Sequence, residues 1–241
     1  MKLKWIWFDL GYTLVYKKRE TAFQKAIMKY GINKDIKDIH YGFHITDKLF
    51  MREYKGYLSK DKQQFMPLYL KKLIKNLSIK EDELNINEGL EEFYRLEDEQ
   101  AEKDGRMWHA YEDSKNVLEM LKNQSIKLGI ISNWDITARE VLRANGLYEY
   151  FDEIIISSEV NISKPTKKIF DMAITKANVL PKECLYVGDN YYDDTIGSTA
   201  VGMNSVIINP YKFHGIEELN EVDVITNIVN LPEYIKIKNI S

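Results

Sequence analysis

The feature that most constrains the fold is a series of short apolar runs that alternate with helical patterns in the second half of the chain. Short, continuous apolar runs are typical of parallel strands that helices cover on both faces of a sheet. The strand–helix–strand order favours right-handed crossovers, and therefore an α/β fold with a doubly wound sheet. We predict five strands and a weaker sixth, at Leu3–Phe8, Lys127–Ile131, Glu153–Ile156, Leu185–Val187, Ser205–Ile208 and Val222–Ile225.

The first gap between these strands breaks the alternation. Residues 16–109 contain no good strand pattern, but they hold apolar residues at helical spacing around Phe23, Tyr69 and Phe93. An insertion of this size is expected to form a helical domain of its own. Ligands in open α/β sheets bind at the carboxyl ends of the strands, and the insertion leaves from the end of the first strand. We therefore predict that it forms a cap over the binding site.

Composition excludes several classes of partner. Apolar residues make up 44% of the 241 residues, enough for a packed core, and the net charge is -3 with no basic stripe, which argues against nucleic acid. The one cysteine, Cys184, excludes a disulfide within the chain and fits a reducing compartment. The apolar run before Asp9 is too short for a signal peptide or a membrane span. We expect a cytoplasmic protein with neither a membrane nor a nucleic-acid partner.

Polar side chains follow four of the predicted strands at the point where each strand ends. Because the carboxyl ends of parallel strands meet at one edge of a sheet, these side chains are expected to share a single site. The joint presence of four such groups is far more specific than any one of them. The residues are Asp9 in FDLGYTL, Ser132 and Asn133 in GIISNWD, Lys164 in SKPTKKIF, and Asp189, Asp193 and Asp194 in GDNYYDD.

In order and spacing, these four motifs resemble those of the haloacid dehalogenase (HAD) superfamily of hydrolases. The resemblance covers about residues 1–15 and 110–210. It implies a core domain, residues 1–15 and 110–241, built on a doubly wound, Rossmann-like parallel sheet. It also implies that residues 16–109 form an inserted α-helical cap domain of the C1 type.

The resemblance implies catalytic roles for Asp9 and Lys164. In the family, the aspartate at the position of Asp9 attacks phosphorus or carbon and forms a covalent aspartyl intermediate. This agrees with the physics, because a carboxylate is a weak nucleophile that needs a positioned electrophile and neutralised charge. Lys164 would reduce the repulsion between nucleophile and phosphate. Ser132, Asn133 and Lys164 are the expected substrate-binding residues.

Gly11 departs from the pattern of the family's phosphatases, which usually carry a second aspartate two residues after the nucleophile. That aspartate protonates the leaving oxygen and then activates water. General acid–base catalysis is typically worth about 10²–10⁴-fold, so its loss matters. Three explanations stay open. Water or a cap residue supplies the proton, the substrate has a good leaving group, or the enzyme is weak or specialised.

The acidic loop GDNYYDD implies a Mg²⁺ site. Mg²⁺ prefers hard oxygen ligands, and clustered carboxylates repel one another unless a cation neutralises them. The resemblance implies ligands from Asp9, the backbone carbonyl of Gly11, Asp189 and Asp194. Asp193 is the alternative. The resemblance favours Asp194, because Gly202 follows it after eight residues, which matches the Asp-to-Gly interval of the family.

These expectations lead to Mg²⁺-dependent hydrolysis of a small phosphate monoester, with a small phosphorylated metabolite as the substrate. A 2-haloacid dehalogenase is the alternative, because halide leaves without a proton and Gly11 would then be no handicap. The carboxylate-rich loop argues against it, since dehalogenases do not use Mg²⁺. A third hypothesis is a catalytically weak protein that binds a phosphorylated metabolite without turning it over.

Overall fold

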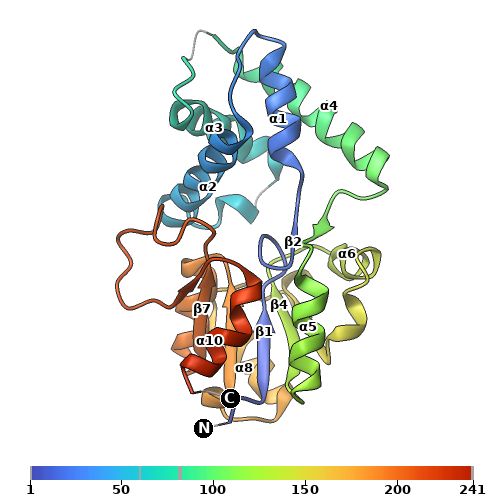
Figure 1. Ribbon diagram of the computed structural model, residues 1–241, viewed down its shortest axis with the longest axis vertical. Helices are drawn as coiled ribbons and strands as arrows, with labels where there is room; N and C mark the ends of the chain where they lie inside the picture. The colour runs from blue at the N-terminus through green and yellow to red at the C-terminus, as the bar shows by residue number, and fades with distance from the viewer. Residues whose placement is uncertain (1, 60, 81–82, 240–241) are drawn as a thin grey trace. The chain divides into compact units, whose positions relative to one another are not determined.

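The computed structural model describes residues 2–59, 61–80 and 83–239 of the chain. The chain divides into two compact units. The first contains the residues up to Tyr16 and those from Ala110 onwards, and the second is Lys17–His109. The chain therefore leaves the first unit after its first strand and later returns to complete it (Figure 1).

A six-stranded sheet forms the centre of the first unit, with all neighbouring strands parallel and the order β5-β4-β1-β6-β7-β8. This confirms the predicted α/β fold, and each of the six predicted runs contains a strand. The order places β1 between β4 and β6, so the residues that follow these three strands are neighbours. The bounds are β1 Trp5–Phe8, β4 Lys127–Ser132, β5 Glu153–Ile156, β6 Cys184–Gly188, β7 Asn204–Ile208 and β8 Val224–Ile225, while β2 Val15–Tyr16 and β3 His109–Ala110 form a separate pair.

Helices cover both faces of the six-stranded sheet (Figure 1). On one face, Ile169 and Phe170 of α8 are buried in a core cluster with Trp7, Ile131 and Tyr186 of the strands. On the other face, α5 and α10 contact each other. Burial on both sides explains why the strands read as unbroken apolar runs. The helices of this unit are α5 Ser114–Asn123, α6 Ala138–Ala144, α7 Ser157–Val160, α8 Lys167–Ala177, α9 Ile196–Ala200 and α10 Leu231–Ile237.

The second unit is helical, and aromatic side chains fill its core. Phe23 packs edge-to-face against both Phe43 and Phe93, with ring centroids 5.5 and 5.8 Å away. Asp35 and Asp61 begin two of the helices as N-caps, because each side chain accepts a hydrogen bond from a backbone N–H of the first turn. The helices are α1 Arg19–Met28, α2 Ile36–Glu53, α3 Lys62–Asn76 and α4 Ile86–Asp104.

The helical patterns noted in the sequence correspond to α1, α3 and α4, whereas α2 was not anticipated. Its buried face contains Ile39, Phe43 and Phe50, but Gly42 and Thr46 are buried between them. The Thr46 hydroxyl donates to the Gly42 carbonyl over 2.7 Å, which allows a polar side chain to sit inside the helix packing. The buried residues Ile39, Phe43 and Phe50 nevertheless follow helical spacing, so this helix could have been predicted from the sequence.

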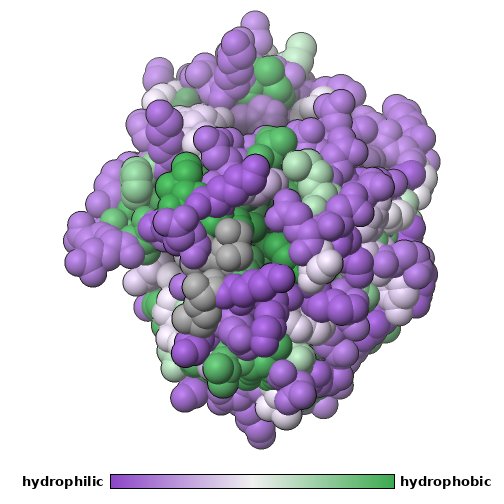
Figure 2. Space-filling model, turned by 60° about the horizontal axis from the view of Figure 1, so that its bottom comes forward, coloured by the Kyte–Doolittle hydropathy of each residue, from purple (hydrophilic) through white to green (hydrophobic). Residues whose placement is uncertain are grey.

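On the face shown in Figure 2, hydrophilic side chains cover most of the surface and hydrophobic residues form smaller patches between them. This agrees with the interleaving of acidic and basic residues along the sequence. Among the described residues, no helix has both the length and the apolar character needed to cross a membrane.

Candidate active site

Asp9 lies directly after β1, at the carboxyl edge of the sheet. Its backbone N–H donates to the carbonyl oxygen of Val187 on β6 over 2.9 Å, so strand pairing continues through the residue and fixes its backbone. Its Oδ1 accepts hydrogen bonds from Ser132 Oγ at 2.8 Å and from Lys164 Nζ at 2.7 Å. Among the described residues, Oδ2 receives no hydrogen bond, which leaves this oxygen able to attack an electrophile.

Lys164 extends its ammonium group between two carboxylates. Its side chain is only 2% exposed, and Nζ lies 2.7 Å from Asp9 Oδ1 and 2.6 Å from Asp194 Oδ1. Burial by itself lowers the pKa of Lys164, but the charges of Asp194 and Asp9 outweigh it and raise the pKa well above its ordinary value. The lysine is therefore a permanent positive charge beside Asp9.

Asp194 can reach Lys164 because the neighbouring residue of β6, Gly188, has no side chain. At Gly188, the last residue of β6, an added Cβ would lie 2.1 Å from Asp194 Oδ2, so only glycine fits there. The same Oδ2 accepts a hydrogen bond from the backbone N–H of Asn190 at 3.0 Å. Burial raises the pKa of Asp194, while the ammonium of Lys164 opposes that shift. Asp194 thus depends on neighbouring positive charge to remain ionised.

The Asn190 side chain holds the turn that presents Asp194. Its Oδ1 accepts a hydrogen bond from the backbone N–H of Tyr192 at 3.1 Å and caps the short π-helical segment Tyr191–Thr195. Its Nδ2 donates to Asp193 Oδ2 at 3.0 Å. Burial, and then the charge of Asp194, raise the pKa of Asp193 to about 6. This local network explains how two consecutive aspartates take different positions, with Asp194 directed to Lys164 and Asp193 to Asn190.

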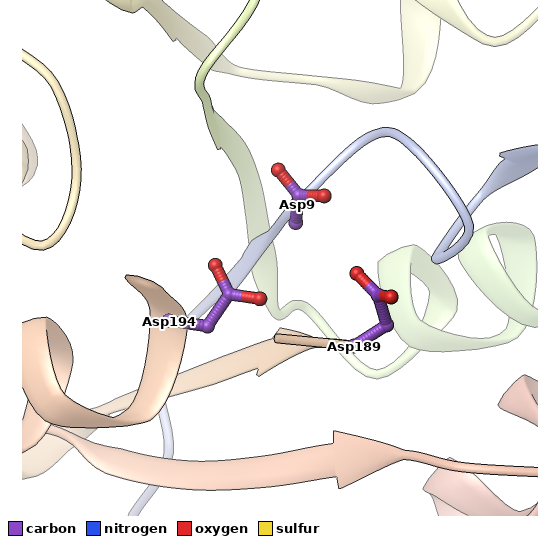
Figure 3. A group of neighbouring side chains, drawn as sticks. All are labelled: Asp9, Asp189 and Asp194. Atoms are coloured by element: carbon purple, nitrogen blue, oxygen red, sulfur yellow. The ribbon is translucent and has the colours of Figure 1, made fainter. Parts of the chain in front are cut away.

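Three carboxylates lie together at the strand ends, and Figure 3 shows Asp189 and Asp194 below Asp9 with their carboxylates directed toward it. One oxygen of each lies within 4.8 Å of the others. Lys164 contacts two of them, Asp9 and Asp194. Carboxylate oxygens gathered this closely are hard ligands that fit a divalent cation such as Mg²⁺.

The other predicted site residues have different surroundings. Gly11 pairs with Val15 through an isolated bridge in the turn after β1. Asn133 Oδ1 accepts a hydrogen bond from the backbone N–H of Lys164 at 2.8 Å, and its Nδ2 donates to the Lys164 carbonyl at 3.0 Å. The Asn133 amide thus braces the loop that carries Lys164, and its predicted contact with substrate stays a prediction. Asp193 lies outside the group formed by Asp9, Asp189 and Asp194.

Sequence reasoning missed Tyr186 and Asn190, both of which contact residues of this site. Tyr186 was assigned only to a buried strand, yet its hydroxyl meets Lys164 Nζ at 2.9 Å. A tyrosine inside a continuous apolar run is a usable signal, since a buried hydroxyl requires a hydrogen-bond partner. Asn190 follows GD in the acidic loop, where asparagine is a strong N-cap residue, so its capping role was also readable.

The chemistry available at this site is nucleophilic attack by a carboxylate beside fixed positive charge. Asp9 has one oxygen held by two donors and a second oxygen that takes part in neither of these hydrogen bonds. Lys164 and a divalent cation would offset the negative charge of an anionic substrate. Such a site suits electrophiles that carry negative charge, such as a phosphoryl group.

Comparison with known families gives a match over most of the chain. The model of the family described as haloacid dehalogenase-like hydrolase matches residues 35–208. The match includes the three motifs that follow β4, β5 and β6.

Two curated relatives are similar over part of their length. Haloacid dehalogenase-like hydrolase domain-containing protein 3 of Mus musculus is 36% identical over 101 residues, which are 42% of this chain and 40% of the relative. Glyceraldehyde 3-phosphate phosphatase of Methanopyrus kandleri is 35% identical over 115 residues, 47% of this chain and 49% of the relative. The chain therefore spans less than half the length of these relatives.

A solved structure is similar along almost the whole chain. The HAD phosphatase from Thermococcus onnurineus is 26% identical, with a TM-score of 0.58, and the match covers 98% of each chain.

Proposed function

The chain belongs to the haloacid dehalogenase-like hydrolase family, and we propose that it is a Mg²⁺-dependent phosphatase that hydrolyses a small phosphate monoester through Asp9. The observation that carries the proposal is the convergence of Asp9, Asp189 and Asp194 around the Lys164 ammonium. Three carboxylates gathered at a strand edge suit a divalent cation better than a halogenated acid without metal, because they would repel the carboxylate of such a substrate. The substrate class is supported by the relative named glyceraldehyde 3-phosphate phosphatase.

In the proposed reaction, Asp9 Oδ2 attacks the phosphorus atom of the substrate. A bond forms between Oδ2 and phosphorus, the ester P–O bond breaks, and its electron pair stays on the leaving oxygen. Lys164 and Ser132 hold Oδ1, so that Oδ2 has a fixed direction of attack. Water then attacks phosphorus as the bond between phosphorus and Asp9 Oδ2 breaks, which restores the Asp9 carboxylate. Of the two protons of water, one ends on the leaving oxygen, which departs as the alcohol, and the other stays on the inorganic phosphate.

We propose that Asp9, the backbone carbonyl of Gly11, Asp189 and Asp194 hold Mg²⁺. The carboxylate cluster fits this ion because it brings three hard oxygen ligands within 4.8 Å of one another. Bound there, Mg²⁺ would offset the negative charge shared by Asp9 and the phosphoryl oxygens.

Asp189→Asn is expected to raise the Mg²⁺ concentration for half-maximal binding by about tenfold or more, because a neutral amide replaces a charged oxygen ligand. Calorimetric titration with Mg²⁺ measures this directly, without a substrate. The matched control is Asp171→Asn, since Asp171 is an exposed residue of α8 outside the site. Equal Mg²⁺ affinities for the parent chain and Asp189→Asn would exclude Asp189 as a ligand.

We further propose that residues 16–109 act as a C1-type cap that sets substrate specificity. The support is their position in the chain and their helical structure, because this segment leaves the core just after the first strand. A lid formed by an inserted domain is a common way to exclude water from a reaction.

The absence of a side chain at Gly11 leads to a test of how the leaving group is protonated. Without an acid two residues after Asp9, we expect kcat/KM to rise steeply as the pKa of the leaving alcohol falls, so that para-nitrophenyl phosphate reacts at least about tenfold faster than phenyl phosphate. Gly11→Asp would restore the missing acid and flatten this dependence. Equal rates for good and poor leaving groups in the parent chain would show that another residue already supplies the proton.

A 2-haloacid dehalogenase remains the second candidate because Gly11 removes the acid that halide departure does not need. One assay separates the candidates. The phosphatase proposal requires Mg²⁺-dependent phosphate release from a panel of metabolite phosphates. Chloride release from 2-chloropropionate without metal would favour the dehalogenase. Binding of a phosphorylated metabolite with no release of either product would favour the third hypothesis.

A further inference from the structure

Tyr186 carries a polar group in the middle of the sheet. The residue belongs to β6, is 0% exposed and lies in the apolar cluster between the sheet and α8. Its ring packs edge-to-face against Phe170, with the centroids 5.4 Å apart. This packing fixes where the hydroxyl lies, and a buried hydroxyl is retained only when it has partners.

The hydroxyl of Tyr186 makes two hydrogen bonds with defined directions. It donates to the carbonyl oxygen of Ile131 at 2.7 Å and accepts from Lys164 Nζ at 2.9 Å. Burial, and then the charge of Asp194, raise the pKa of Tyr186 well above its ordinary value, so the phenol keeps its proton. An ammonium group has no acceptor, which means that Lys164 must be the donor.

This contact completes the hydrogen bonding of the Lys164 ammonium. A lysine ammonium has three N–H donors. In this structure Nζ contacts three acceptors, Asp9 Oδ1 at 2.7 Å, Asp194 Oδ1 at 2.6 Å and the Tyr186 hydroxyl at 2.9 Å. The two carboxylates draw the ammonium by charge, whereas the hydroxyl is neutral and restricts its rotation and position.

The second partner of Tyr186 links this network to the neighbouring motif. Ile131 precedes Ser132, the other residue that contacts Asp9 Oδ1. The strands β4 and β6 flank β1 on its two sides. The Tyr186 hydroxyl, carried by β6, therefore links the ammonium to β4, the strand that carries Ser132.

We propose that Tyr186 is a positioning residue. Its hydroxyl holds the Lys164 ammonium where both Lys164 and Ser132 donate hydrogen bonds to the same oxygen of Asp9. The inference depends on the proposed function for its effect on catalysis. With one oxygen of Asp9 fixed by two donors, the other keeps a single direction of attack. Without the hydroxyl, Lys164 keeps its charge but gains freedom to shift between Asp9 and Asp194.

The test is Tyr186→Phe, which removes one oxygen atom and keeps the ring that packs on Phe170. Two measurements are made: kinetics with para-nitrophenyl phosphate and Mg²⁺, and the ¹H–¹⁵N signal of the Lys164 ammonium, assigned through its side-chain carbons. We expect kcat to fall about tenfold with KM changed less than about twofold. We also expect the ammonium signal to shift or to broaden through faster proton exchange.

Tyr234→Phe is the matched control. Tyr234 lies in α10 of the first unit, outside the site, and its partly buried hydroxyl donates to Asp223 Oδ2 at 2.9 Å, so this change also removes a hydroxyl from a charged partner. It should leave kcat and the Lys164 signal unchanged. The comparison separates a general loss of stability from an effect at Lys164.

The two measurements together decide whether Tyr186 positions Lys164. An unchanged Lys164 signal in Tyr186→Phe overturns the proposal, and so does a shifted signal with unchanged kcat. A parallel loss of kcat in Tyr234→Phe would also overturn it, since the effect would not then be specific to Lys164. If the parent chain releases no phosphate but the signal shifts only in Tyr186→Phe, the contact is upheld and the proposed function fails.

Discussion

Replacing Asp9 with asparagine is expected to reduce Mg²⁺-dependent phosphate release by about 10⁴-fold or more, because an amide cannot act as the nucleophile. The change is nearly isosteric, and the amide oxygen can still accept hydrogen bonds from Ser132 and Lys164. The loss should therefore appear in kcat, with little change in the folded structure. The measurement is phosphate release from para-nitrophenyl phosphate at saturating Mg²⁺.

The control for this substitution is Asp171→Asn, the same chemical change at an exposed position on α8. It should leave phosphate release unchanged. Thermal unfolding of both variants checks that each is folded at the assay temperature. If Asp9→Asn kept a tenth or more of the parent activity while folded, the nucleophile would have to be another residue.

Lys164→Met is expected to lower the free energy of unfolding by about 3–5 kcal/mol, because it leaves buried carboxylates without their charge partner. The Lys164 side chain and that of Asp194 are each 2% exposed, so water cannot replace the lost ammonium easily. Urea denaturation without metal measures the loss. Phosphate release should also fall by at least about 10²-fold, since Asp9 loses its cationic neighbour.

Magnesium provides an internal check on the Lys164→Met result. A divalent cation among Asp9, Asp189 and Asp194 would neutralise part of the charge that Lys164 leaves behind. Adding Mg²⁺ should therefore raise the Tm of Lys164→Met more than that of the parent chain. An equal effect of Mg²⁺ on both, or unchanged stability in the variant, would contradict the charge account of this site.

The strands and the main site residues were predictable because they depend on local signals. Unbroken apolar runs identified the buried strands, and parallel strands must end at a common edge, which brings Asp9 next to Ser132 and Lys164. The three aspartates of the loop GDNYYDD are visible directly in the sequence. None of these inferences required knowledge of how side chains pack.

The features that were missed depend on tertiary contacts. The role of Tyr186 was not predicted because its ring is part of the core and its hydroxyl meets Lys164 only in the folded protein. The contact of the Asn133 amide with the Lys164 backbone, 31 residues away in the sequence, was not foreseen, and the predicted contact of Asn133 with substrate stays a prediction. The helix α2 is different, because its apolar residues Ile39, Phe43 and Phe50 follow helical spacing and it could have been predicted.

The central claim is that Asp9 takes the phosphoryl group from the substrate before water releases it. The direct measurement is rapid acid quenching during turnover of para-nitrophenyl phosphate with Mg²⁺, followed by mass spectrometry of the peptides. The account predicts one added phosphoryl group on the peptide that contains Asp9, absent from Asp9→Asn and lost when turnover ends. A phosphoryl group on a different residue, or turnover in which no peptide is ever modified, would contradict it.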